Sequence, residues 1–308
     1  MIVATLNLKN MFGSGEWQHY SKTISYDEDF VAKRTKYLTK VIASLKADII
    51  VLQEVGSPEV LGKITAALPR KYDMFVAEPD RRGIANGLLF GRNLSCSCES
   101  IRLVPSLPPL SIKDSKTDGA KGTQRRAYIL AKTTYNKLPL YIIGVHFKSS
   151  NPTYLTDTAG HQQEPQSQVD VCDGYIRAEL ARLAEARALR SFVDELITSV
   201  PNIQLVIAGD YNDTELSPTV KAIRGDEAMF GGNLENVCER IPPPKRYSKL
   251  TLGVKRLIDH MLISNNISKN VASVRIMNKS LNDQDGIEPS KEAFIIESDH
   301  APIVVKFK

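Results

Sequence analysis

The chain has 308 residues, of which 42% are hydrophobic and 24% are charged, and its net charge is +5. This composition suits a globular protein with a large core and excludes a disordered or fibrous chain. No apolar run approaches the roughly 18 residues of a membrane span. The modest positive charge permits a polyanionic partner without demanding one, because nucleic-acid binding needs the charge concentrated on one face.

The start of the chain and its cysteines bear on the compartment. Met1 leads directly into the strand-like IVATLNL, without a basic and then apolar leader. We expect a cytoplasmic protein if Met1 is the native start, and a secreted or periplasmic one if a leader was trimmed. The four cysteines lack zinc-ligand spacing, and Cys96 and Cys98 are too close for a relaxed disulfide. We expect mostly free thiols, with one bridge if the protein is secreted.

The first half of the chain alternates predicted strands and helices. Apolar runs predict strands over 2–8 and 49–52, with further strands within 72–83, 83–92 and 93–104. Helical spacing predicts a helix over 29–46, and Ser57, Pro58 and Glu59 predict the start of another that ends near Leu68. The polar segment 12–28 is expected to be irregular.

Two long polar segments flank a predicted hairpin. Residues 106–126 are rich in Lys, Arg, Ser, Gly and Pro and should form an exposed loop. A hairpin follows, with strands over 126–134 and 138–147. Residues 149–175 should form a second long loop, of a kind that is often functional. A long helix is predicted from about 175 to 198.

The second half continues the alternation. The pattern predicts a buried strand over 205–208, a short helix over 218–223 and an irregular stretch over 224–249. Strands are expected over 256–264 and 271–277, with a polar insert over 278–291 before the final strands on either side of Ser298. No linker divides the chain, so we expect one domain over 1–308.

Polar residues follow several apolar strands at the point where each strand ends. Asp210 and Asn212 come directly after 205–208, and residues two apart in an extended segment point to the same side. An Asx-type turn is the alternative reading of these two residues taken alone. Polar residues that could contribute to a site occur in five further segments. Four are at the ends of predicted strands and the fifth is within one: Asn7, Gln53 with Glu54, His146, Asp299 with His300, and Asp259.

If these strand ends converge, they form a site with carboxylates, carboxamides and two imidazoles. Carboxylates with few other ligands suit Mg²⁺ or Mn²⁺ rather than zinc. A hard cation beside histidine is suited to phosphoester hydrolysis, because the metal neutralises developing charge and an acid-base group serves the water and leaving group.

Six short motifs together resemble a known family. In chain order they are TLNLKNMF, DIIVLQEV, GVHFKSS, AGDYND, RLIDHMLIS and ESDHAPIV. They resemble the endonuclease/exonuclease/phosphatase superfamily, also called deoxyribonuclease-I-like, over residues 2–307. Each motif alone is weak, but six in order are specific. The resemblance implies an α/β fold, a four-layer α/β/β/α sandwich of two mixed β-sheets, with one catalytic domain over 1–308 and Mg²⁺ or Mn²⁺ as cofactor.

The resemblance also implies a metal site and a role for the GDYND motif. Glu54 resembles the principal metal ligand, Asn7 the asparagine that supports the metal or its water, and Asp299 a metal-side aspartate. Asp210 resembles the aspartate that activates or positions the attacking water. Asn212 resembles the asparagine that holds the phosphate.

Two histidines receive acid-base roles from the same resemblance. His300 is expected to contact phosphate or serve as a base, and Asp259 to orient its ring. His146 matches a histidine of the deoxyribonuclease-like branch, and Glu78 is its expected partner. Which histidine is acid and which is base stays open. His260 is expected to be a packed histidine, because neighbouring strand residues face opposite ways.

Basic residues suggest where a phosphate backbone would bind. Lys148, Arg125 and Arg126 are the candidate substrate-binding residues, with Arg81, Arg82 and the lysines of 106–126 around them. A solubilising loop and a plain surface lysine are the alternatives. Arg182 and Glu185 are either a solvated intrahelical pair or part of the site.

The leading hypothesis is a metal-dependent phosphodiesterase, expected to be a monomeric nuclease that cleaves DNA or RNA with little base specificity. A phosphatase or phosphodiesterase for a lipid or small phosphoester is the alternative, since fold does not settle substrate. A binding module with a decayed site is a third hypothesis, which the intact set of motif residues disfavours. The chain lacks the PAWCDR-type element of inositol polyphosphate 5-phosphatases and an exposed aromatic hairpin for entering membranes.

Overall fold

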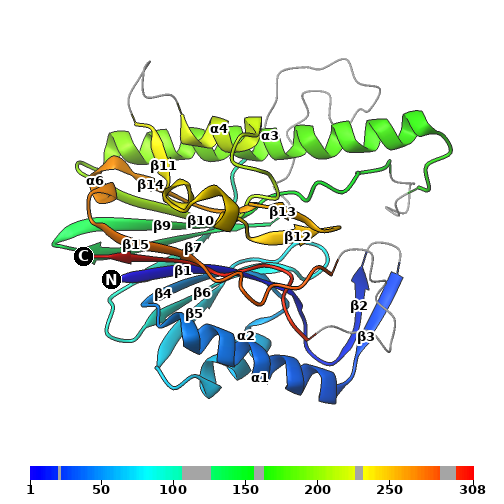
Figure 1. Cartoon of the computed structure of the whole chain (residues 1–308), viewed down its shortest axis with the longest axis horizontal. Coiled ribbons are helices and arrows are strands. Elements are labelled where there is room, and N and C mark those ends of the chain that lie inside the picture. Colours follow the sequence, from blue (N-terminus) through cyan, green and yellow to red (C-terminus); the bar gives the residue numbers. More distant parts are fainter. Residues whose placement is uncertain (20–21, 106–125, 156–162, 226–231, 285–295) are drawn as a thin grey trace.

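A computed structural model describes residues 1–19, 22–105, 126–155, 163–225, 232–284 and 296–308. Two six-stranded β-sheets lie face to face between layers of helices (Figure 1). Sheet I has the strand order β15 (Val271–Ile276), β16 (Ile303–Phe307), β1 (Ile2–Met11), β4 (Ile49–Val55), β6 (Ala85–Gly91) and β5 (Tyr72–Val76). Sheet II has the order β11 (Leu234–Asn236), β14 (Asp259–Ser264), β10 (Gln204–Asp210), β9 (Leu138–His146), β8 (Tyr128–Tyr135) and β7 (Ser97–Ile101).

Both sheets are mixed. In sheet I, β1 runs parallel to β4 and antiparallel to β16. In sheet II, β10 runs parallel to β9 and antiparallel to β14. The parallel pair in each sheet therefore ends at the same edge, which places the residues that follow these strands close together.

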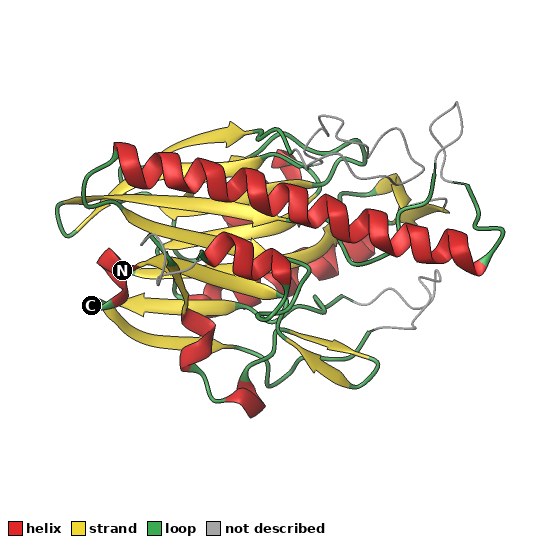
Figure 2. Cartoon of the chain, turned by 90° about the horizontal axis from the view of Figure 1, so that it is seen from above, coloured by secondary structure: helices red, strands yellow, loops and turns green. Residues whose placement is uncertain are grey.

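Helices cover the outer face of each sheet. Helices α1 (Glu28–Leu45) and α2 (Pro58–Ala67) pack on sheet I, and α3 (Gln168–Ser199) and α4 (Pro218–Arg224) lie over sheet II (Figures 1 and 2). Smaller elements are the hairpins β2 (Gly15–His19) with β3 (Lys22–Tyr26) and β12 (Lys249–Thr251) with β13 (Val254–Arg256), helix α6 (Asn265–Ser268), and 3-10 turns at Val237–Arg240 and Pro243–Lys245.

The core has three layers because each sheet is buried on both faces. Along β4, Ile49 and Val51 point into the cluster between the sheets, whereas Ile50 and Leu52 point toward α1 and α2. Both sets are fully buried. This arrangement explains why the strands read as continuous apolar runs rather than as alternating ones. The predicted four-layer sandwich of two mixed sheets is confirmed.

Three local expectations are wrong. The segment 12–28 contains the β2–β3 hairpin, where the Trp17 ring stacks on Phe12 with centroids 4.4 Å apart. Helix α3 begins at Gln168, seven residues before the expected start, because the Ser167 side chain caps it by accepting the N–H of Asp170. The stretch 224–249 contains β11 and the two 3-10 turns. The expected loop over 106–125 lies outside the described residues.

The thiols and the helices agree with two further expectations. All four cysteines are free, and the sulfur atoms of Cys96 and Cys98 lie 3.8 Å apart. Among the described residues, no helix combines the length and apolar character that crossing a membrane requires.

Candidate functional site

The candidate site lies where the ends of β1 and β4 in sheet I meet the ends of β9 and β10 in sheet II. Asn7 of β1 and Asp210 of β10 are 203 residues apart in the chain, yet the Asn7 amide donates to Asp210 Oδ2 at 3.0 Å. In the parallel pair of sheet II, His146 lies directly beside Asp210. The predicted convergence of these strand ends is therefore present in the structure.

Three groups at this edge can hold a cation together. The Nε2 atom of His146 faces Glu54 Oε1 at 3.8 Å and Asp210 Oδ2 at 3.6 Å. One ligand atom from each of these residues lies within 4.8 Å of the other two. Two carboxylates beside an imidazole are a donor set that suits a hard divalent cation.

Glu54 reaches this position through a strained backbone. Its φ is +60°, in the left-handed region, at an irregularity in the pairing of β4 with β6 between Leu52 and Val55. Its Oε2 accepts the backbone N–H of Asn10 at 2.6 Å. Left-handed backbone at a non-glycine residue persists only where its surroundings hold it, and such residues gather at functional sites.

The Asn7 side chain bonds to two carboxylates of the cluster. Its Oδ1 accepts the backbone N–H of Lys9 at 2.8 Å. Its Nδ2 therefore points inward and donates to Glu54 Oε1 and Asp210 Oδ2, each at 3.0 Å. The predicted role of Asn7 in supporting the metal site fits this geometry, and direct ligation of a metal by Asn7 stays a prediction.

Asp210 is fully buried and crowded by other acids. Burial first, and then the charge of Asp259, raise its pKa to about 7. Its Oδ1 accepts the backbone N–H of Asn212 at 2.7 Å, where Asn212 adopts a φ of +50°. The Asn212 amide also donates to Asp210 Oδ2 and to the carbonyl of Phe147. The Asx-type turn is therefore present, and it leaves Asp210 within the cluster, so the functional reading of GDYND stays a prediction.

His300 and Asp259 form a buried pair on the other side of Asp210. The ring Nδ1 lies 2.8 Å from Asp259 Oδ2. Burial opposes a charge on the ring, but Asp259, Asp299 and Asp210 outweigh it and raise the pKa of His300 to about 9. Asp210, Asp259 and His300 form a second group of mutually close ligand atoms. The predicted orientation of His300 by Asp259 matches this geometry.

His146 has the opposite charge state. Burial, and then the positive charges of Arg126 and His300, lower its pKa well below the ordinary value, so the ring is neutral. Its Nδ1 is buried and has no hydrogen-bond partner within the described part of the chain.

The predicted partnership of Glu78 with His146 is wrong. The Glu78 side chain is 64% exposed, and its carboxylate pairs with Arg102 at 2.8 Å. The buried acid of that turn is Asp80, which accepts from Arg82 at 3.3 Å and pairs with Arg126 at 3.4 Å. Glu78 and Asp80 both stand in AEPDRRG, and the sequence does not show which of the two acids faces inward.

Asp299 is held by lysines rather than by the Glu54 cluster. Its Oδ2 lies 3.0 Å from Lys249 Nζ and 3.5 Å from Lys9 Nζ. Burial alone would raise the pKa of Asp299, but His300 and the two lysines lower it below the usual range. Asp299 is absent from both groups of close ligand atoms that the described residues contain, and its role as a metal-side aspartate stays a prediction.

The predicted substrate-binding residues are mostly engaged in the scaffold. The Lys148 ammonium is buried and donates to the carbonyls of Ser149 and Asn151, each at 2.7 Å. Arg126 is also buried and donates to the carbonyls of His146 and Phe147. Neither presents its charge to solvent, so both assignments are corrected. Arg125 lies outside the described residues.

Two helical residues brace the loops of the site. Arg182 of α3 is buried, donates to the carbonyl of Ser149 and pairs with Asp213 at 3.4 Å. Glu185 accepts the backbone N–H of Lys148 at 2.9 Å. The reading of this pair as a solvated helix face is therefore wrong. His260 is packed as expected: its Nε2 bonds to the carbonyl of Asp213 and its ring meets Tyr211 edge-on.

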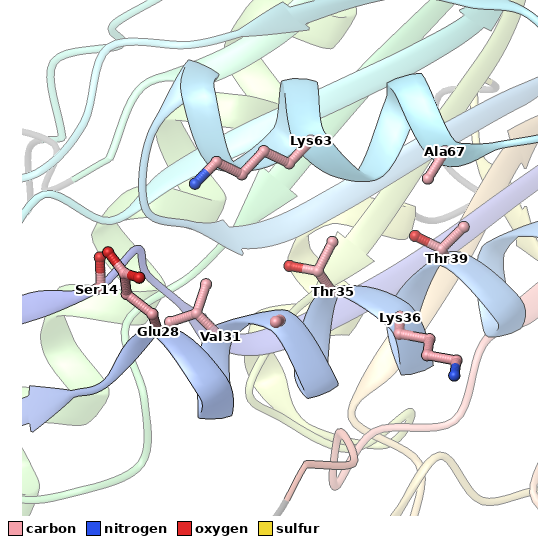
Figure 3. Close-up of a pocket in the computed structure, with 9 residues that line it drawn as sticks. Ser14, Glu28, Val31, Thr35, Lys36, Thr39, Lys63 and Ala67 are labelled. Carbon is pink, nitrogen blue, oxygen red and sulfur yellow. The ribbon is translucent and has the colours of Figure 1, made fainter.

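Sequence reasoning missed Lys9, Lys249, Asp80 and the buried Arg34. The motifs assigned a role to none of these four residues, although Lys9 stands within TLNLKNMF and Asp80 within AEPDRRG. The open groove between α1 and α2, of about 730 Å³, was also not anticipated; Thr35 and Thr39 line it on one side and Lys63 on the other (Figure 3). None of the residues that line this groove belongs to the Glu54–Asp210–His300 site.

Comparisons with known proteins give likeness in structure only. No family model matches the chain, and no curated protein matches it. Truncated TDP2 from Caenorhabditis elegans superposes with a TM-score of 0.58 at 14% identity, covering 99% of this chain and 96% of that one. The human Nocturnin catalytic domain with bound sulfate gives 0.55 at 13% identity, over 100% and 94% of the two chains. An endonuclease/exonuclease/phosphatase protein from Bacteroides vulgatus gives 0.55 at 16% identity, over 100% and 98%.

These superpositions span the whole length of the chain. With the two mixed sheets and their flanking helices, they show that the chain has the deoxyribonuclease-I-like fold of the endonuclease/exonuclease/phosphatase superfamily. At such low identity the likeness concerns the fold, and the function must be argued from the site.

Proposed function

We propose that the chain is a divalent-metal-dependent phosphodiesterase, and specifically a nuclease, whose residues 1–308 act as one catalytic domain. The observation that carries this proposal is that Asp210 belongs to two groups of converging ligand atoms, one with Glu54 and His146 and one with Asp259 and His300. A cation site and an acid-base pair thus share one carboxylate.

The donors around Asp210 fit a hard divalent cation. Glu54 and Asp210 would hold Mg²⁺ or Mn²⁺, with the neutral Nε2 of His146 facing the same place. Such a cation supplies charge neutralisation at the phosphoryl oxygens when it is bound. Asn7 orients both carboxylates by donating to each of them.

His300 is suited to supply a proton or a positive charge. Its pKa of about 9 keeps the ring protonated at neutral pH, and its Nδ1–H is held by Asp259. The remaining Nε2–H is the atom that would donate to a phosphoryl oxygen or a leaving group. Asp259 Oδ1 is buried without a hydrogen-bond partner among the described residues. The hydrogen bond that the Asp259 carboxylate accepts from His300 is therefore its main interaction there.

A polynucleotide is the substrate class that we favour. The net charge of +5 and the two lysines beside His300 suit a polyanion. The sulfate bound to the Nocturnin catalytic domain is consistent with a fold that binds tetrahedral anions. Contacts of this kind are made to phosphate, so little base specificity is expected.

The test is a plasmid-nicking assay with Mg²⁺ or Mn²⁺, with and without chelator. We expect nicking that EDTA abolishes and that His300→Gln reduces by roughly 10²-fold or more. Glutamine can still donate to Asp259 but carries no proton to transfer. Arg92→Gln, which removes an exposed arginine paired with Asp73, is the control and should nick like the wild type.

Two other outcomes would contradict the proposed nuclease activity. Hydrolysis of a lipid phosphodiester or a small phosphomonoester, with plasmid left intact, would replace it with the small-ester hypothesis. Inertness toward every ester, with no divalent ion bound in equilibrium dialysis, would mean a binding module.

A further inference from the structure

Two cysteines with neighbouring sulfur atoms lie outside the candidate site. Cys98 is the second residue of β7, and Cys96 comes two residues before it. Residues two apart in an extended segment point to the same side, so both thiols lie on one face. Their Sγ atoms are 3.8 Å apart. This is within reach of an S–H···S hydrogen bond and well beyond the roughly 2.05 Å of a disulfide bond. The fold therefore holds two reduced thiols against each other.

The pair lies in an edge strand of sheet II, because β7 is the last strand in the order of that sheet. Both cysteines are half-buried and pack against the apolar cluster between the sheets. Cys98 is paired with Ala131 of β8, which in turn is paired with Ile142 of β9, four residues before His146. The two thiols are thus accessible in part and separate from the strand ends that form the candidate site.

The contact makes the two thiols unequal. With the S–H of Cys98 as the donor, the hydrogen bond lowers the pKa of the Cys96 thiol, and burial opposes this by a smaller amount. The same hydrogen bond, and then burial, raise the pKa of the Cys98 thiol. The thiolate is the nucleophile in thiol chemistry, so Cys96 is suited to attack first and Cys98 to react second.

The other two cysteines provide references within the same chain. Cys172 is exposed on α3, and Cys238 is fully buried. Among the described residues, neither has a sulfur–sulfur contact like that of Cys96 with Cys98. Cys172 therefore reports how a single accessible thiol reacts, and Cys238 how an inaccessible one does.

We propose that Cys96 and Cys98 form a two-thiol reaction site for small disulfides such as oxidised glutathione, and that the pair closes reversibly into a disulfide. The Cys96 thiolate attacks one sulfur of the small disulfide, whose S–S bond breaks, and one thiolate leaves with the proton that Cys96 released. The Cys98 thiolate then attacks Cys96 Sγ, and the second thiolate leaves with the proton of Cys98. Two protein thiols are oxidised to one disulfide while the small disulfide is reduced to two thiols.

The close spacing makes the closed form easy to reopen. Cysteines two residues apart are too close for a relaxed disulfide, and strained or exposed disulfides are the labile ones. Excess reduced glutathione should therefore return the pair to two thiols. The proposal does not depend on the phosphodiesterase function, since the pair contacts none of the residues assigned to that site.

Peptide mapping of the folded protein tests the proposal. Cleavage after Arg and Lys places both Cys96 and Cys98 in peptide 93–102, Cys172 in 149–177 and Cys238 in 225–240. Oxidised glutathione is raised until peptide 149–177 carries glutathione. The sample is then quenched with acid, denatured, labelled with N-ethylmaleimide and digested.

We expect peptide 93–102 to lose two hydrogens and to carry neither glutathione nor label. Peptide 225–240 should carry the label alone. Treatment with excess reduced glutathione before labelling should restore two labels on peptide 93–102.

Single-cysteine variants separate the two thiols. Cys98→Ser should accumulate glutathione on Cys96, because the second step then has no thiol. Cys96→Ser should take up glutathione about tenfold more slowly, because only the less acidic thiol remains. Cys172→Ser is the matched control and should close the pair as the wild type does.

Two outcomes would overturn the proposal. One is glutathione retained on wild-type peptide 93–102 to the same extent as in Cys98→Ser. The other is an unmodified peptide 93–102 in a sample whose Cys172 has taken up glutathione. Both are read within the wild-type chain, so they hold even if a variant fails to fold. A failure to nick plasmid would bear on the proposed function alone.

Discussion

At the scale of single residues, the site sets two buried imidazoles to opposite charge states. His146 is neutral because burial and nearby cations disfavour its charge, whereas three carboxylates hold His300 protonated. Both rings are buried to a similar degree, so the neighbours decide the difference. Groups whose environments push their pKa values apart are suited to different acid-base tasks.

Replacing Asp259 should change the charge of His300. In metal-free Asp259→Asn, the pKa of His300 should fall from about 9 toward or below 6.5, since the main opposing cause, burial, remains. The raised pKa stabilises the folded wild type fully below pH 6.5, and that stability is lost as pH rises through about 9. NMR titration of the histidine ring protons reads the shift, and urea unfolding at pH 6 and pH 9.5 reads the stability. An unchanged pKa in the variant would contradict the assigned pairing.

Asp210 should couple cation binding to pH. Its pKa of about 7, against 3.8 unfolded, means that the metal-free protein holds a proton there below neutrality. Because the pKa of Asp210 is raised in the folded state, the contribution of this group to folding stability is fully present below pH 3.8. That contribution is lost as pH rises through about 7. A cation must displace the proton, so Mn²⁺ affinity should rise with pH up to about 7 with proton release. Calorimetry in buffers of different ionisation enthalpy measures this release, and its absence at pH 6 would refute the coupling.

At the scale of elements, the place of Asp210 depends on how closely β9 and β10 approach. Gly209 precedes Asp210 and has a φ of +150°, and a Cβ there would lie 2.0 Å from the carbonyl oxygen of Val145. No side chain fits without moving one strand. The parallel register that sets His146 beside Asp210 therefore depends on this glycine.

Gly209→Ala should destabilise the protein by about 3 kcal/mol or more, because it adds both overpacking and backbone strain. It should also weaken Mn²⁺ binding by moving His146 away from Asp210. Gly253→Ala is the matched control: its φ is +78° but nothing lies within 4 Å of the added carbon, so only the conformational strain remains. Urea denaturation compares the two, and equal effects would show that the close approach does not matter.

At the scale of the whole molecule, the site joins the two sheets. Sheet I supplies Asn7 and Glu54, and sheet II supplies His146, Asp210 and Asp259. Repulsion among the carboxylates opposes the packing of these two edges unless cations offset it. A bound divalent ion should therefore stabilise the entire sandwich.

Saturating Mn²⁺ should raise the melting temperature. When the free Mn²⁺ concentration is about a hundredfold above Kd, binding should add about 2.7 kcal/mol to the free energy of unfolding. For a chain of this size, that corresponds to a rise in melting temperature of roughly 5 °C. EDTA should reverse the rise and Glu54→Gln should reduce it. Glu99→Gln, which removes an exposed acid paired with Lys132 on sheet II, should leave it intact. A shift of equal size in Glu54→Gln and wild type would place the ion elsewhere.

The sequence by itself determined the order of the main strands and helices and most polar strand ends, and the resemblance of its motifs implied the four-layer fold. Apolar periodicity follows directly from which faces are buried, and short motifs mark where strands stop. Asp210, Asp259 and His300 were found in this way because each lies next to a strongly apolar strand.

Only the tertiary structure decided which side chains meet. It excluded Glu78, turned the Asn7 amide toward the carboxylates, buried Lys148 and Arg126, and brought Lys9 and Lys249 to Asp299. These outcomes depend on contacts between segments up to 290 residues apart, counted from Lys9 to Asp299. The local sequence pattern indicates on which face of a strand or helix a residue lies. Which side chain it contacts depends on how the two sheets pack together, and no short stretch of sequence contains that information.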